Sequence, residues 1–325
     1  MMKITKPAAG AALALALAAG TAAAQDKVTV AYFLEWPTAN QVAQLEKTYD
    51  EALGVEVEWR AFGNGNEMSQ AMASGDVDIA YSQGLVPFVV AVTNGLPLEL
   101  VGVAVSYAEA DNCIIRTDSG ITQANASELE GKRIGTPIGN VTHYKLLRML
   151  DHLGVDATKV EFVQMNGADA AVAMMQGDVV MGCAFGGPVQ RMMEVGAPLM
   201  TADEQEAIGI RVFDVVSVTK SFAAEHPDLL TKFMQVTDEA NSAYAADPAA
   251  ALPTIARAAG MDEPATAELL GMFSFPTNAE QASDAWLGGT VQTFMKEVAD
   301  FFVAQGQLDR AAEDYSSAVN AGFLQ

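Results

Sequence analysis

The sequence predicts an α/β fold of two lobes, each a mostly parallel β-sheet flanked by helices. Short apolar strands alternate with helical segments, and this alternation runs through the chain twice. Strands separated by helices are typical of parallel sheets. The 325 residues also exceed what one ordinary hydrophobic core accommodates, so two folding units are favoured over one.

The first 24 residues have the composition of a secretory signal peptide. Lys3 and Lys6 precede an apolar run that is too short to span a membrane, and Ala22-Ala23-Ala24 supplies small residues for cleavage. An ordinary frayed N-terminus is the alternative. We expect export to the periplasm and a mature chain that begins at Gln25.

The first α/β unit follows this segment. Apolar residues that alternate or cluster predict strands, and apolar residues spaced three to four apart predict helices. The expected strands are Val28–Tyr32, Val55–Trp59, Asp78–Tyr81 and Leu98–Val103. The expected helices are Gln41–Leu53, Met68–Ser74 and Val86–Asn94. Gly54 and Gly75 end the first two helices, as glycine commonly does at helix C-termini.

A second unit of similar size repeats the pattern, and helices complete the chain. Its expected strands are Cys113–Arg116, Ile134–Pro137, Val160–Gln164 and Val179–Ala184, with helices at His143–Leu153 and Ala168–Gln176. Further helices are expected at Phe222–Ala245, Asp247–Ala259, Pro264–Leu270 and Trp286–Gln305. The chain should cross to the second lobe near 105–112 and return near 213–220. The expected division is 25–108 for lobe 1, 109–213 for lobe 2, and 214–325 for the return to lobe 1.

Two stretches of the chain look like internal equivalents. MASGDVDIAYSQGLVPFV (72–89) and MMQGDVVMGCAFGGPVQR (174–191) both suggest a helix end, Gly-Asp, an apolar strand, a small-residue turn and a Pro-containing helix start. Gly-Asp is common after helices, which is the alternative explanation. Two equivalent lobes would bind a ligand outside the carboxyl ends of their strands.

Acidic side chains strongly outnumber basic ones. The chain has 18 Lys and Arg against 41 Asp and Glu, a formal net charge of −23, or −25 without Lys3 and Lys6. Such a surface repels nucleic acids and anionic lipids, which excludes both as partners. Solubility alone also explains the charge. An anionic ligand would have to be held by local hydrogen-bond donors.

Residues Gly139-Asn140-Val141-Thr142-His143 form a small polar turn between a strand and a helix. The first N–H groups of a helix lack intrahelical partners and attract anions, and Asn140 and Thr142 add donors. A similar turn, Gly63-Asn64-Gly65-Asn66, opens an earlier helix, although Glu67 already satisfies the helix dipole there. Simple capping by Asn140 or Thr142 is the alternative.

The sequence gives no sign of a metal site or a nucleophilic triad. His143 and His152 lie nine residues apart, which places them on opposite faces of a helix, and His226 is remote. Neither CxxC nor GxSxG occurs. We therefore expect no metal, no cofactor and no enzymatic activity.

Four stretches resemble the taurine-binding periplasmic proteins of ABC importers, within a broader group of aliphatic-sulfonate and nitrate binders. They are VTVAYFLEWPTANQVAQ, FGNGNEMSQAMASGDVDIAYSQG, GKRIGTPIGNVTHYKLL and FDVVSVTKSFAAEHPDLL, and the resemblance spans essentially the whole mature chain. It implies a type II periplasmic binding protein, a Venus-flytrap receptor that closes on taurine (2-aminoethanesulfonate). The implied partners are this small ligand and the permease and ATPase subunits of the inner membrane. A monomer is expected.

The resemblance also assigns roles to residues. Asp214 aligns with the aspartate of the family's LDVW segment and is expected to accept the ligand's ammonium, although a paired or capping Asp is the alternative. Glu35 is the second candidate, beside Trp36, whose face can cover an alkylammonium group. The other expected ligand-binding residues are Asn40, Gly65, Asn66, Ser82, Gln83, Asn112, Asn140, Val141, Thr142, His143 and Phe185.

Two departures from the family pattern leave the ligand open. The FLEWPTANQ turn is one residue longer than usual, and Phe185 replaces a common tryptophan. Another small sulfonate and an alkylammonium zwitterion are therefore alternative ligands.

Two other functions also stay open. One is an enzyme like the pyrimidine-precursor synthases of thiamine biosynthesis, with His143 and pyridoxal phosphate. The other is a binding subunit of a sensor.

Cys113 and Cys183 are candidates for a disulfide. In a family-like topology the strand that enters the second lobe runs antiparallel beside the strand that contains Cys183, which brings the two residues together. Export would make oxidation available. Two reduced, buried cysteines are the alternative.

Overall fold

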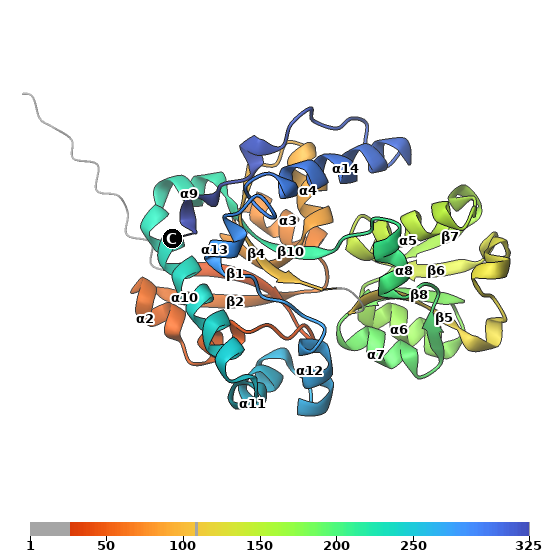
Figure 1. The fold of residues 1–325 in the computed structure, drawn as a ribbon, viewed down its shortest axis with the longest axis horizontal. Coiled ribbons are helices and arrows are strands. Elements are labelled where there is room, and N and C mark those ends of the chain that lie inside the picture. The colour runs from red at the N-terminus through yellow and green to blue at the C-terminus, as the bar shows by residue number, and fades with distance from the viewer. Residues whose placement is uncertain (1–26, 108–109, 325) are drawn as a thin grey trace, which may run out of the picture.

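The computed structural model describes residues 27–107 and 110–324. Two lobes lie side by side, each around its own five-stranded sheet (Figure 1). This confirms the predicted α/β class. The expected signal peptide, residues 1–24, lies outside the described residues.

The first lobe has the strand order β2-β1-β3-β10-β4. The strands are β1 (Lys27–Phe33), β2 (Glu56–Phe62), β3 (Ile79–Gly84), β4 (Leu98–Ser106) and β10 (Phe213–Thr219). β1 pairs in parallel with β2 and β3, whereas β10 is antiparallel to both β3 and β4. The returning chain therefore supplies the one strand that runs against the others in this sheet.

The second lobe repeats this arrangement with the order β7-β6-β8-β5-β9. Its strands are β5 (Asp111–Arg116), β6 (Arg133–Thr136), β7 (Glu161–Gln164), β8 (Met181–Phe185) and β9 (Gly196–Pro198). Here β5, the strand that enters the lobe, is antiparallel to β8 and β9. The internal equivalence is also visible at the helix ends, because Gly75 and Gly177 both end a helix with φ near +80°.

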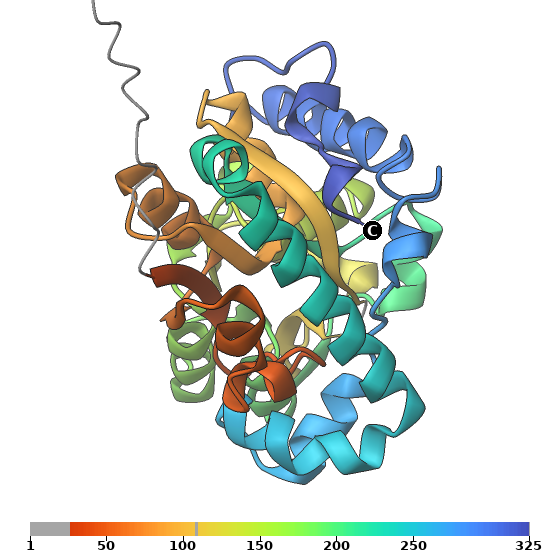
Figure 2. The ribbon, with the colours of Figure 1, turned by 90° about the vertical axis from the view of Figure 1, so that its left-hand side faces the viewer.

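Helices cover both faces of the sheets. The helices of the first lobe are α1 (Gln41–Leu45), α2 (Thr48–Leu53), α3 (Gly65–Ser74), α4 (Leu85–Thr93), α9 (Lys220–Glu225), α10 (Pro227–Ala246), α11 (Pro248–Ala259), α12 (Glu263–Leu270), α13 (Asn278–Gln281) and α14 (Thr290–Ala304). Those of the second are α5 (Val141–His152), α6 (Gly167–Gln176), α7 (Gly187–Met193) and α8 (Ala202–Ala207). α2 and α10 pack on one face of the first sheet, while α3, α4 and α14 cover the other (Figure 2). No helix of the described ranges is both long and apolar enough to cross a membrane.

The largest hydrophobic cluster continues from one lobe into the other. Tyr144 on α5 packs its ring on Phe301 and Phe294 of α14, with ring centroids 5.4 and 6.4 Å apart. This is a closed arrangement of the lobes. Within the second lobe, the structure contains a disulfide between Cys113 and Cys183, which face each other directly across β5 and β8.

Some expected elements differ from those observed. The helix expected over residues 41–53 is two helices, because Lys47 adopts a left-handed conformation (φ +59°) between them. β3 and β4 run further than expected, to Gly84 and Ser106, since the antiparallel β10 supplies them with partners. The short elements β9, α8 and α13 carry too few residues for a periodic pattern and were not expected.

Candidate functional site

A small cavity between the lobes brings together part of the predicted site. Its volume is about 20 Å³, which is room for about one water molecule. It lies at the carboxyl ends of β1, β3 and β8, the edge where ligands of open α/β sheets bind. Its lining residues are Phe33, Trp36, Gly84, Tyr107, Asp111, Asn140, Val141, Thr142, Phe185 and Asp214.

The N-terminus of α5 forms the donor side of the cavity. Asn140 precedes the helix but makes no capping bond to it among the described residues, because its Oδ1 accepts from the N–H of Gly65 at 2.9 Å. Asn140 Nδ2 and Thr142 Oγ1 are buried and have no hydrogen-bond partner within the described ranges. The first-turn N–H groups and the helix dipole also favour an anion here. For an anion, this turn therefore has backbone N–H groups without a side-chain cap and polar side-chain groups without a hydrogen-bond partner among the described residues.

The N-terminus of α3, the second predicted anion turn, is satisfied by its own residues. Asn64 Oδ1 accepts from the N–H groups of Asn66 and Glu67, both at 3.0 Å. Asn66 Nδ2 in turn donates to the carbonyl of Ile138 at 2.9 Å, across the lobe boundary. This loop holds the α5 turn in place and does not line the cavity, so the two helix N-termini have different roles.

Asp214 lies at the acceptor side, near the start of β10. It is 2% exposed, and its two carboxylate oxygens accept from the hydroxyls of Tyr107 at 2.7 Å and Ser82 at 2.6 Å. Trp36 Nε1 donates to the same Ser82 hydroxyl at 3.1 Å. Burial raises the pKa of Asp214 to about 7, although the two hydroxyl bonds act in the opposite direction. A cation beside this carboxylate would favour its charged form.

A second buried carboxylate, Asp111, lines the same cavity and was not among the predicted residues. It opens β5 as Asp214 opens β10, an acid at the start of an apolar strand. That pattern was the signal for Asp214 and would have found Asp111 too. Lys145 Nζ, on α5, lies 3.8 Å from Asp111 Oδ1. Burial raises the pKa of Asp111 to about 7, while the charge of Lys145 lowers it.

Aromatic rings form the remaining wall. Trp36 stands at right angles to Tyr107, with ring centroids 4.8 Å apart, and Phe33 packs on Phe185 at the same distance. Trp36 also meets Phe185 edge-on at 5.5 Å. Phe185 therefore contributes an aromatic ring to the cavity wall. Ring faces of this kind attract alkylammonium groups.

Glu35 has a different environment from the expected one. Its carboxylate binds the Arg191 guanidinium of α7 through two hydrogen bonds of 2.8 and 2.9 Å, and its carbonyl accepts from the N–H of Gly187 at 3.1 Å. Arg191 and Gly187 belong to the second lobe, so Glu35 joins the lobes outside the cavity. Arg191 occupies both carboxylate oxygens of Glu35 in this conformation, so a contact of Glu35 with the ligand's ammonium stays a prediction that this conformation does not support.

His143 also lies away from the cavity. Its Nδ1 accepts from the N–H of Gly139 at 3.2 Å, and its ring stacks on Phe302. Burial lowers the pKa of His143 to about 4, so the ring is neutral at physiological pH. The position of His143 supports neither the expected contact with the ligand nor an acid–base role.

The other predicted residues do not line the cavity in the closed arrangement. They are Asn40, Gly65, Asn66, Ser82, Gln83 and Asn112. Gln83, for example, donates to the Gly65 carbonyl at 3.0 Å, and Asn112 donates to the Met200 carbonyl at 3.2 Å. Ser82 contacts a lining residue, because its hydroxyl donates to Asp214.

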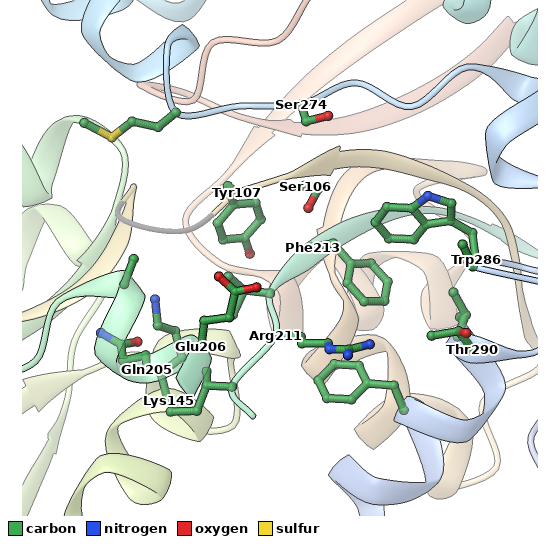
Figure 3. A pocket seen from close by; sticks show the side chains of 17 residues that line it. Ser106, Tyr107, Lys145, Gln205, Glu206, Arg211, Phe213, Ser274, Trp286 and Thr290 are labelled. Carbon is green, nitrogen blue, oxygen red and sulfur yellow. The ribbon is translucent and has the colours of Figure 1, made fainter. Parts of the chain in front are cut away.

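A larger groove of about 500 Å³ runs along the segments that connect the lobes (Figure 3). It includes the exposed residues Glu206 and Arg211 and the partly buried Trp286. Tyr107 lines both this groove and the small cavity. We place the ligand in the smaller space, because the buried polar atoms without partners face it and the groove is open to solvent. Within the described ranges, no group of three or more His, Cys, Asp or Glu side chains is placed to hold a metal.

Comparisons with known proteins agree with one another. The family described as "NMT1/THI5 like" matches residues 38–251. The chain is 30% identical to the taurine-binding periplasmic protein of Escherichia coli K12 over 92% of both chains. It is also 30% identical to a putative aliphatic sulfonates-binding protein of that strain, over 42% of this chain and 40% of the other. Among solved structures, the alkanesulfonate-binding protein SsuA of Xanthomonas axonopodis pv. citri, bound to MOPS, superposes with a TM-score of 0.76 at 20% identity, covering 91% of this chain and 98% of the other.

Proposed function

Because the chain belongs to the NMT1/THI5-like family, we propose that it is a periplasmic solute-binding protein of an ABC importer and captures taurine between its lobes. Its 30% identity with a taurine-binding protein over 92% of the chain supports this assignment. The polarity of the cavity is the observation that most strongly supports this function. Unpartnered donors at the N-terminus of α5 face one side, and a buried Asp214 between aromatic rings faces the other.

This arrangement matches the chemistry of a small amino-sulfonate. A sulfonate has three acceptor oxygens and one negative charge, which suits the α5 turn with Asn140 and Thr142. The ammonium, two carbons away, suits Asp214 and the face of Trp36. Because the cavity walls come from both lobes, the ligand stabilises the closed form by binding it more tightly than the open one.

The proposed site consists of the cavity-lining residues, and we propose the division 25–108, 109–213 and 214–325 for the lobes. The closed outer surface would then be read by the permease and ATPase of the importer. Export through residues 1–24 would place the protein in the periplasm. No enzymatic activity is proposed, because His143 is neutral and packed outside the cavity.

Isothermal titration calorimetry of the protein from Gln25 onward tests the proposal. Taurine should bind at least about tenfold more tightly than ethanesulfonate, sulfate or β-alanine, since each of these lacks or alters one half of the zwitterion. Preference for sulfate or β-alanine would contradict the substrate. Heat from none of the small sulfonates would contradict the proposed function.

A second ligand class is favoured by one observation, the aromatic wall of Trp36, Tyr107, Phe33 and Phe185. Such a wall also suits methylated ammonium groups, which bind through ring faces more than through hydrogen bonds. The same titration should therefore include N,N,N-trimethyltaurine and glycine betaine. Tighter binding of the methylated compounds than of taurine would change the assigned substrate to an alkylammonium zwitterion.

A further inference from the structure

We propose that Asp111 is a second ligand-binding carboxylate, which shares the ligand's ammonium with Asp214, and that Lys145 is the residue that positions it. The inference rests on the proposed function, because it concerns how an amino-sulfonate is recognised in the same cavity. It adds a residue pair from the second lobe to a site whose cation-binding side otherwise belongs to the first.

The placement of Asp111 supports a ligand-binding role. It is the first residue of β5, lies opposite Phe185 in the β5–β8 register, and is 2% exposed. Its Oδ1 is buried and accepts no hydrogen bond from any part of the chain that the structure describes. A buried carboxylate oxygen without a donor is costly, so a donor from outside the chain is strongly favoured.

Lys145 holds Asp111 in place but donates no hydrogen bond to its Oδ1. The residue is 1% exposed, and its Nζ donates to the backbone carbonyl of Asp111. The 3.8 Å between Nζ and Oδ1 is within ion-pair range but too long for a hydrogen bond. Lys145 therefore compensates charge while the lone pairs of Oδ1 remain available. Figure 3 shows Lys145 and Tyr107 among the side chains that line the neighbouring groove.

The charges around the cavity make an ammonium necessary. The carboxylates of Asp111 and Asp214 line the cavity, and Lys145 is the cation beside Asp111. Tyr107 is neutral because burial raises its pKa well above the usual range. The other charged groups of the neighbouring elements that the structure describes do not line the cavity. Arg191 of α7 is bound to Glu35, and Glu206 and Arg211 are exposed on the groove that Lys145 also lines. Among the described residues at the cavity, Asp111, Asp214 and Lys145 together leave one negative charge, which a ligand ammonium would neutralise.

A sulfonate without an amine leaves that charge uncompensated, so one of the two carboxyls must bind a proton. Burial raises the pKa of both carboxyls to about 7. Taurine should therefore bind equally well or better as the pH rises from 6 to 8. Ethanesulfonate should bind with uptake of one proton and lose affinity above pH 7, by about tenfold for each pH unit.

The test is calorimetric titration of the full mature chain with taurine and ethanesulfonate at pH 6, 7 and 8. Asp111→Asn should weaken taurine about 30-fold or more at pH 8, as for the loss of a buried charge partner. The same variant should tighten ethanesulfonate at pH 8 and flatten its pH dependence. Asp118→Asn, in the same lobe but with an exposed carboxylate, is the matched control and should change neither ligand.

Lys145→Met tests the positioning role, with the melting temperature as a check on folding. Without the charge of Lys145, Asp111 binds a proton more readily. As the pH falls, taurine binding by the variant should therefore begin to weaken at a higher pH than binding by the wild type. A uniform loss of affinity at every pH would make Lys145 merely structural and overturn its role.

If Asp111→Asn weakens both ligands equally, or neither, the role of Asp111 is overturned while the proposed function stands. If the wild-type protein binds neither ligand, the proposed function and this inference fail together.

Discussion

Under the proposed function, recognition of the ligand's cation depends most on Asp214. Replacing it by Asn keeps the shape and lets the rotatable Ser82 and Tyr107 hydroxyls adjust, but removes the charge. Asp214→Asn should therefore weaken taurine by about 2–4 kcal/mol and weaken ethanesulfonate much less. Titration calorimetry at pH 8 measures both. Equal losses for the two ligands would show that Asp214 only supports the structure.

The same carboxylate should lower the stability of the ligand-free protein at high pH. The folded-state pKa of Asp214, about 7, lies above the ordinary value of 3.8, so the proton is held more tightly in the folded state. This group's contribution to the free energy of unfolding is thus lost as the pH rises from about 4 to 7, and stays lost above. Asp214→Asn should unfold at a higher temperature than the wild type at pH 8, with the difference vanishing near pH 4. A difference independent of pH in differential scanning calorimetry would contradict this.

At this scale, the sequence revealed some functional residues and missed others for physical reasons. Asp214, Asn140 and Thr142 were found because each stands at a strand or helix boundary, where its polar group needs a partner. Tyr107 was missed because it lies in a crossing segment without periodicity, and its hydroxyl meets Asp214 only when β10 returns beside β4. The ion pair of Glu35 with Arg191 was not predictable, because the two residues are 156 positions apart in the chain.

Among the elements, the turn between β8 and α7 packs directly against the backbone of the opposite lobe. Gly186 has φ +65°, and a Cβ there would collide with the Glu35 carbonyl. Gly186→Ala should therefore disfavour closure and weaken taurine at least about tenfold. Gly120→Ala is the matched control, because Gly120 has φ +69° in the same lobe with nothing within 4 Å of its Cβ position. Both variants should lose about 1–2 kcal/mol of stability from backbone strain, but only Gly186→Ala should lose affinity. Equal affinities of the two variants would refute a role in closure.

The β5–β8 pair should owe part of its stability to the disulfide. The Cys113–Cys183 bond closes a loop of 70 residues, which on the chain-entropy model contributes about 4 kcal/mol, and often less in practice. Reduction, or replacement of both cysteines by alanine, should lower the unfolding temperature of the second lobe. Mass spectrometry of unreduced, alkylated protein from the periplasm checks the bond itself. Two alkylated thiols there would contradict it.

Elements with a full period were predictable, and short ones were not. α3, α5, α10 and the apolar strands follow from hydrophobic spacing and from glycine at helix ends. The break between α1 and α2 was not predictable, because Lys47 is a good helix former and its type gives no sign of the left-handed conformation that it adopts. Sheet order was likewise not predictable, because local sequence does not encode which strands pair with one another.

The molecule as a whole should change shape on binding. With the lobes in contact around a 20 Å³ cavity, a ligand of taurine's size cannot enter without their separation. Small-angle X-ray scattering should show a smaller radius of gyration with saturating taurine than without it. Gly186→Ala should show a weaker contraction, with the Gly120→Ala variant as control. An unchanged radius of gyration in the wild type would argue against hinge closure.

The location of Asp214 and Tyr107 beside the crossing segments also sets an order of events in time. If the lobes part about these segments, as the proposed function requires, these groups would move least and the second lobe would carry the α5 turn away. An arriving ligand would then meet the acid and the rings first, and would reach Asn140 and Thr142 only as the lobes close. The positive end of the ligand would decide whether it is captured, and the negative end would decide how long it stays bound.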